Sequence, residues 1–100
     1  MNIVQEKAGK SVVLTLNGRL DTVNAPQLES KIKEQEDITE LTLDFKEVNY
    51  ISSMGLRVLL QAKKEMKANG ARLKIINMRD SVREIFEMTG FLTLMEREDK

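Results

Sequence analysis

The fold of this 100-residue chain is indicated most clearly by Tyr50-Ile51-Ser52-Ser53-Met54-Gly55-Leu56-Arg57-Val58-Leu59-Leu60. Before it, Leu41–Phe45 alternates apolar and polar residues, which is typical of a strand. From its second half onward, apolar residues recur at helical spacing, at Val58, Ala62 and Met66. A strand is therefore expected to give way to a helix inside this stretch, and its two serines fall at the expected start of the helix.

Ser52 and Ser53 lie where an added phosphate would meet a favourable field. Free backbone N–H groups and the positive end of the helix dipole stabilise an anion at a helix N-terminus. A serine before a helix is, however, more often a helix cap than a regulatory site. From the residues alone, a structural cap and a phosphorylation site both remain open.

Length and charge limit the function classes. One hundred residues suit one small domain, expected to span residues 1–100. With 16 basic and 16 acidic residues the formal charge is zero, which argues against binding to nucleic acid or to a membrane surface. No apolar stretch is long enough to cross a bilayer and no signal-peptide pattern opens the chain, so we expect a cytoplasmic protein.

Two missing residue types argue against an enzyme. The chain has no cysteine and no histidine, which removes thiolate chemistry, the commonest metal ligand and the commonest general base. No pair of carboxylates or lysines stands out by spacing, and Asp44, Glu47 and Asp80 lack the spacing of a metal site. We therefore expect a protein without catalytic activity, metal or cofactor.

The remaining elements follow from periodicity and turn signals. Strands are predicted at Asn2–Glu6, Ser11–Leu16, Glu40–Phe45, Arg72–Asn77 and, as a fifth, Leu92–Met95. Helices are predicted from Asn24 to about Gln35, from the serine pair to about Ala68, and from Ser81 to before Gly90. An initial hairpin followed by alternating strands and helices predicts an α/β fold. Its mixed sheet has four to five strands, right-handed crossovers in its parallel part, and about three helices packed on it.

Local signals add finer expectations. Two capping boxes are predicted, Asn24 with Gln27 and Ser81 with Glu84. The chain also predicts a turn at Asn17-Gly18, a hydrophobic staple between Val23 and Leu28, and core positions for Met66, Met78 and Met88.

The helix after the serines has an unusually wide apolar surface. Leu56 and Leu60 extend past the arc of the core-facing positions, and Lys63 shares that extension. A partner-binding surface and a helix wrapped on a curved sheet explain this width equally well. Gly55 is expected to allow close packing near the helix start, and Asp21 is expected to cap a turn rather than to recognise a partner.

Three motifs follow one another in a recognisable order. They are Gly18-Arg19-Leu20-Asp21 followed by Ala25, the stretch Tyr50–Leu60, and Phe86-Glu87-Met88-Thr89-Gly90-Phe91. The first resembles the motif before the first helix of STAS domains of the bacterial anti-sigma factor antagonist type. The second resembles their phosphorylation loop and following helix, and the third resembles the end of their short C-terminal helix. The resemblance runs nearly end to end and implies the STAS fold.

The resemblance implies that Ser53 is the phosphoacceptor, with Ser52 as the alternative. In the family an aspartate usually precedes the phosphorylated residue and a small hydroxyl residue often follows it, whereas this chain has Ser52 and Met54 there. The candidate partner-binding residues are Asp21, Ser52, Met54, Gly55, Leu56, Leu60 and Lys63.

Partner switching is the function that the resemblance implies. The unphosphorylated chain would bind an anti-sigma factor that is also a serine kinase, freeing a sigma factor for transcription. Phosphorylation would end that binding, and a serine/threonine phosphatase would restore it, so that ATP and metal belong to the partners. The chain itself would be a monomer or a weak dimer. The alternative is a STAS scaffold that is never phosphorylated and holds an anion, nucleotide or lipid at the same loop. An enzyme that works with carboxylates is the least favoured hypothesis.

Overall fold

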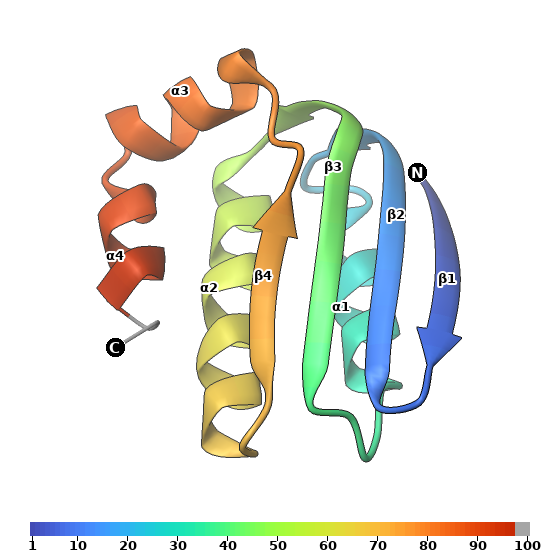
Figure 1. The fold of residues 1–100 in the computed structure, drawn as a ribbon. Helices are drawn as coiled ribbons and strands as arrows, with labels where there is room; N and C mark the ends of the chain where they lie inside the picture. The colour runs from blue at the N-terminus through green and yellow to red at the C-terminus, as the bar shows by residue number, and fades with distance from the viewer. Residues whose placement is uncertain (98–100) are drawn as a thin grey trace.

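A mixed sheet organises the computed structural model, which describes residues 1–97 (Figure 1). Its strands are β1 (Asn2–Ala8), β2 (Ser11–Leu20), β3 (Glu40–Ile51) and β4 (Arg72–Ile76), and they lie in this order across the sheet. β1 is antiparallel to β2, whereas β2, β3 and β4 are mutually parallel. The predicted hairpin and mixed sheet are confirmed.

Helices cover one face of the sheet. α1 (Ala25–Lys33) connects β2 to β3 and α2 (Ser53–Ala68) connects β3 to β4, and both lie behind the sheet in Figure 1. α3 (Asp80–Met88) and α4 (Phe91–Arg97) follow β4 and lie beyond its outer edge (Figure 1). The part of the chain described thus contains four helices, one more than expected. No helix in it is both long and apolar enough to cross a bilayer.

The core lies between the sheet and the two crossover helices. β2 contributes Leu14 and Leu16, β3 contributes Leu43, and α2 contributes Leu59, all fully buried. Alternate strand residues reach this layer because successive side chains point to opposite faces of a sheet. The predicted core stripe of α2 is confirmed, since Val58, Ala62 and Met66 are also buried.

The predicted turn at Asn17-Gly18 is wrong. β2 continues through it to Leu20, with shifts in its pairing to β3 between Thr15 and Asn17 and between Gly18 and Arg19. Gly18 has a φ of +118°, which glycine adopts without strain, so the strand bends instead of ending. β3 likewise runs past the predicted end at Phe45 to Ile51, which is buried.

The predicted fifth strand at Leu92–Met95 is a helix, α4. A stretch of only four mostly apolar residues fits a strand or a helix, and the wider context decides between them. Phe91, Leu92 and Met95 fall at positions i, i+1 and i+4, which share one helical face, and they pack on the core.

The two predicted capping boxes are not formed. The backbone of Asn24 is already helical (φ −106°, ψ −5°), so its side chain turns back and accepts a hydrogen bond from the Asp21 N–H at 2.8 Å. Gln27 donates to the Met1 carbonyl at 3.0 Å. Ser81 lies inside α3, whose N-cap is Arg79.

Two further expectations about apolar side chains are wrong. Val23 is 88% exposed and makes no staple with the buried Leu28. Met88 is 79% exposed on α3, although Met66 is buried and Met78 is partly buried against the core, as predicted.

Candidate functional site

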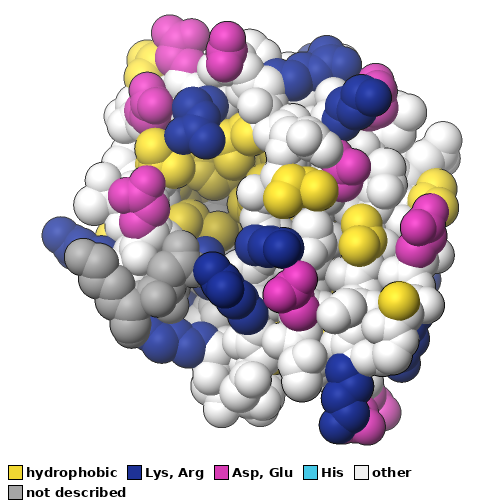
Figure 2. Space-filling view, in the orientation of Figure 1, with side chains coloured by type: hydrophobic (Ala, Val, Ile, Leu, Met, Phe, Trp, Pro, Cys, Tyr) yellow, Lys and Arg dark blue, Asp and Glu magenta, His cyan; other side chains and the backbone are white. Residues whose placement is uncertain are grey.

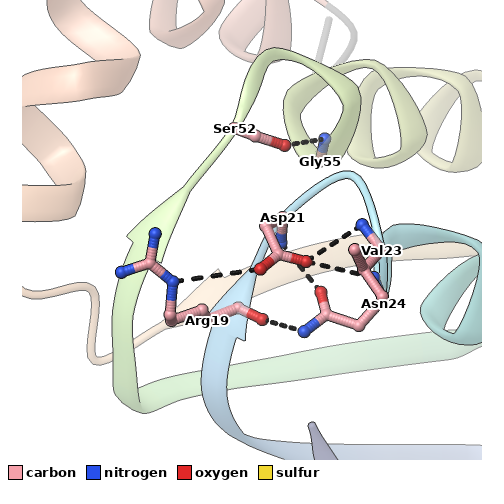
Figure 3. A network of polar contacts seen from close by, with 6 residues as sticks. All are labelled: Arg19, Asp21, Val23, Asn24, Ser52 and Gly55. Carbon is pink, nitrogen blue, oxygen red and sulfur yellow. Dashed lines mark hydrogen bonds and ion pairs between the residues drawn. The ribbon is translucent and has the colours of Figure 1, made fainter.

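Ser52 is the N-cap of α2. Its backbone is extended (φ −93°, ψ 171°), and its Oγ accepts a hydrogen bond from the Gly55 N–H at 3.2 Å (Figure 3). Its own N–H donates to the Leu20 carbonyl at 2.9 Å, which ties the helix start to the end of β2. The cap interpretation is therefore correct for Ser52, whose half-buried hydroxyl holds the first turn of the helix.

Ser53 is the first residue of α2, and it is exposed. Its hydroxyl makes no hydrogen bond to any residue between 1 and 97. The residue lies at the end of the helix where backbone N–H groups lack intrahelical partners and the dipole is positive. The structure thus gives the neighbouring serines different environments: one hydroxyl serves the helix and the other faces outward.

Gly55 lets the start of α2 approach the sheet closely. A Cβ atom at this position would lie 2.9 Å from Ile51 Cγ1 and 2.9 Å from both Cγ and the carbonyl oxygen of Leu20. Such distances are shorter than van der Waals contact, so a side chain would push the helix away from the ends of β2 and β3. The predicted packing role of Gly55 is confirmed.

Asp21 holds the turn between β2 and α1. Its Oδ1 accepts hydrogen bonds from the N–H groups of Val23 (3.0 Å) and Asn24 (3.1 Å), and Asn24 Nδ2 donates to the Arg19 carbonyl (Figure 3). The Arg19 guanidinium lies 4.4 Å from the ring centroid of Tyr50, and its Nε is 3.9 Å from Asp21 Oδ2. The predicted turn-capping role of Asp21 is confirmed, and the network fixes the turn beside the start of α2.

Three large apolar side chains are exposed on the segments that meet at this end of the sheet. Val23 comes from the Asp21 turn, Tyr50 from the end of β3, and Met54 from the first turn of α2, and they are 88%, 37% and 41% exposed. Water-exposed large apolar groups that gather near one another mark candidate contact surfaces. This end of the molecule is therefore suited to contact with another protein.

A shallow hollow of about 360 Å³ adjoins Met54. Four further residues of α2 and one residue of α1 complete its lining: Arg57, Val58, Leu60, Gln61 and Glu29. Neither Arg57 nor Glu29 was predicted from the sequence as a site residue. The spacing of four residues from Ser53 places Arg57 on the same helical side and could have indicated it, whereas no local pattern connects Glu29 to the site.

Three predicted contact residues are not at the surface. Leu56 is 1% exposed and packs in the core, and Lys63 is 8% exposed, with its Nζ donating to the Leu73 carbonyl at 3.3 Å. Gly55 is buried as well. The extra width of the apolar face at Leu56 is therefore explained by packing on the sheet. The structure leaves Asp21, Ser52, Met54 and Leu60 partly or fully accessible at the site.

Acidic side chains do not cluster into a metal site in the described part of the chain. No group of three or more acidic side chains within residues 1–97 has the geometry to hold a metal ion. What the arrangement provides is an accessible hydroxyl at a helix N-terminus with apolar side chains around it.

A model of the STAS domain family matches residues 2–99. The chain is 34% identical over 96 residues to the putative anti-sigma factor antagonist BtrV of Bordetella bronchiseptica. The matched region covers 94% of this chain and 83% of that protein. It is 27% identical over 97 residues to the anti-sigma-B factor antagonist of Staphylococcus aureus, with 95% and 90% covered.

Solved structures show the same fold. The anti-sigma factor antagonist SpoIIAA in its unphosphorylated form superposes with a TM-score of 0.71 at 24% identity, covering 87% of this chain and 83% of that chain. An anti-sigma factor antagonist from Mycobacterium paratuberculosis gives a TM-score of 0.80 at 21% identity, with 92% and 80% covered.

Proposed function

The chain belongs to the STAS domain family, and on that premise we propose that it is an anti-sigma factor antagonist that acts by partner switching. In its unphosphorylated form it binds an anti-sigma factor that is also a serine kinase, and a sigma factor is released for transcription. Phosphorylation of Ser53 ends the binding. The two related proteins that carry the name of anti-sigma factor antagonist support this assignment.

The observation that carries the proposal is the difference between the two serines. A kinase must bring the acceptor oxygen to the γ-phosphate of ATP, and the exposed hydroxyl of Ser53 is available for this. The Ser52 hydroxyl is half-buried and holds the Gly55 N–H, so transfer to it would disturb the helix cap. The geometry favours Ser53 over Ser52 on grounds that are independent of the family pattern.

Magnitudes favour a switch in binding over a switch in folding. A phosphate carries about −1.5 to −2 charges at pH 7. At the N-terminus of α2 it should stabilise the domain by about 0.3–1 kcal/mol, which is small beside a domain stability of about 5–15 kcal/mol. At an interface the same charge, when desolvated or opposed by an acidic group, opposes binding by about 2–5 kcal/mol. The fold therefore survives while the complex is lost.

The surface around Ser53 has the composition of a docking site. Interfaces concentrate aromatic residues and methionine in their centre, and Tyr50 and Met54 are exposed on either side of the serine pair. Val23 is presented by the turn that Asp21 holds. A phosphate on Ser53 would lie next to Met54 in the first turn of α2, where a partner that covers this surface must exclude water.

The cycle requires two partners and no chemistry from this chain. The anti-sigma factor supplies the kinase activity, and a serine/threonine phosphatase returns the chain to its binding form. ATP and the phosphatase metal are bound by those partners. The chain contributes the acceptor hydroxyl and the docking surface.

Phosphate mapping tests the proposal. The cognate kinase and ATP are incubated with the wild-type chain and with Ser52→Ala and Ser53→Ala variants, and the products are analysed by mass spectrometry. We expect one phosphate on Ser53 in the wild type and in Ser52→Ala, and none in Ser53→Ala, which should bind the kinase whether or not ATP is present. A phosphate on Ser52 of the wild type contradicts the assignment. A kinase that binds the chain without phosphorylating it overturns the switching mechanism.

A further inference from the structure

We propose that a hollow between β4, α3 and α4 binds a small amphipathic anion, an aliphatic chain that ends in a carboxylate. The hollow has a volume of about 180 Å³ and shares no lining residue with the surface around Ser53. Its lining consists of five apolar and five charged residues: Ile75, Met78, Phe86, Leu92 and Met95, and Lys63, Arg72, Lys74, Arg83 and Glu96. Figure 2 shows hydrophobic side chains recessed in this region of the surface, with Lys and Arg side chains beside them.

Basic residues outnumber acidic residues around the hollow. The whole chain is neutral, with 16 basic and 16 acidic residues, yet four basic residues and one acidic residue line this hollow. Lys74 forms an ion pair with Glu40 at 3.2 Å. The side chains of Arg72 and Arg83 are exposed and form neither an ion pair nor a hydrogen bond with any residue between 1 and 97. Each of these guanidinium groups is therefore available to pair with an anionic head group.

Apolar side chains form the base of the hollow, called here its apolar floor. Phe86 and Met95 are 1% and 5% exposed, and Ile75, Met78 and Leu92 are half-buried around them. Methionine side chains are flexible and adapt to irregular apolar ligands. A head group held by the arginines would leave an attached aliphatic chain in contact with this floor.

The lining favours an aliphatic anion over a nucleotide. It contains no hydroxyl or amide side chain that could read the edge of a base, and the ring of Phe86 is too deeply buried to stack on one. Sites for drug-sized molecules usually enclose about 300–1,000 Å³, so a hollow of about 180 Å³ suits a smaller ligand. Octanoate combines a single carboxylate with a short aliphatic chain and is the appropriate probe.

Titration with three probes tests the chemistry. Octanoate, kept below the concentration at which it forms micelles, is added to the isotopically labelled full chain while amide resonances are followed. We expect saturable one-to-one binding, with shifts concentrated in β4, α3 and α4. Octan-1-ol should bind about tenfold more weakly, because its neutral hydroxyl cannot form an ion pair with a guanidinium group. Acetate, which lacks the chain, should produce no saturable shifts.

A pair of variants separates the site from the rest of the surface. Arg83→Gln should weaken octanoate binding about tenfold, while Lys33→Gln, which removes an exposed charge on α1, should leave it unchanged. Unchanged far-ultraviolet circular dichroism establishes that both variants fold. Equal binding of octanoate and octan-1-ol, unchanged binding by Arg83→Gln, or shifts confined to residues that do not line the hollow would each overturn the proposal.

Discussion

Two adjacent hydroxyl groups have different tasks at the start of α2. The Ser52 hydroxyl accepts a hydrogen bond from the Gly55 N–H and caps the helix, whereas the Ser53 hydroxyl faces outward. The sequence alone placed both serines at the helix start and left the two tasks unassigned. The difference depends on backbone angles, because only an extended residue directs its side chain back to the first free N–H groups.

This division predicts unequal effects of two alanine substitutions on stability. Ser52→Ala removes the cap and should lower the free energy of unfolding by about 1 kcal/mol. Ser53→Ala removes an exposed hydroxyl from a helix position and should change it by no more than about 0.5 kcal/mol. Urea unfolding of both variants provides the measurement. A larger loss for Ser53→Ala than for Ser52→Ala would show that the cap is assigned to the wrong residue.

Gly55 predicts a penalty that helix propensity alone would not suggest. Alanine normally stabilises a helix interior relative to glycine by about 1 kcal/mol. Here its Cβ would lie 2.9 Å from side-chain and backbone atoms of Leu20, so the helix start must shift. Gly55→Ala should therefore lower the free energy of unfolding by about 1–3 kcal/mol. A stabilised variant in the same urea experiment would contradict the close approach of α2 to β2.

Among the helices and strands, long periodic patterns predicted the type of element correctly, and short patterns did not. The alternation in β2 and the sustained helical spacing in α2 predicted both elements, because each buries one face against the core. The four residues Leu92–Met95 fit either period, and α4 forms because its apolar face packs on the core. The continuation of β3 to Ile51 depends on pairing with β2 across an irregular register, which no local signal shows.

The position of Ser53 at the N-terminus of α2 predicts that negative charge there stabilises the fold. Ser53→Asp should raise the free energy of unfolding by about 0.3–1 kcal/mol, and Arg57, four residues on, can add a favourable pair. Because the effect is electrostatic and exposed, it should shrink in 1 M salt. The measurement is urea unfolding at low and high salt, with Ser30→Asp on the exposed side of α1 as the control. A destabilised Ser53→Asp would indicate that phosphorylation acts by disturbing the fold.

In the whole molecule, the candidate site forms because the topology of the sheet brings distant segments of the chain together. The ends of the parallel strands β2 and β3 lie side by side, so the turn at Asp21 meets the start of α2 although about thirty residues separate them in the chain. The sequence predicted Asp21, the serine pair and Met54 as separate pieces. It could not predict that Arg19 stacks on Tyr50 or that Glu29 lines the same surface as Arg57, since these contacts join distant segments.

The assembled surface predicts which methionine matters for partner binding. Met54 is 41% exposed beside Ser53, so Met54→Ala should weaken binding to the anti-sigma factor at least tenfold, as truncation of an interface anchor does. Met88 is 79% exposed on α3, outside the docking surface, so Met88→Ala is the matched control and should bind as the wild type does. Calorimetric titration of both variants gives the comparison. Equal affinities would place the docking surface elsewhere on the molecule.

A phosphate on Ser53 should weaken partner binding strongly while the fold persists. The decisive measurement is a titration of the cognate anti-sigma factor, without ATP, with the unphosphorylated chain and with the same chain fully phosphorylated on Ser53. A penalty of about 3 kcal/mol at the interface corresponds to a loss of about 100-fold or more in affinity, and the circular dichroism spectrum should be unchanged. Equal affinity of the two forms would contradict a binding switch at Ser53.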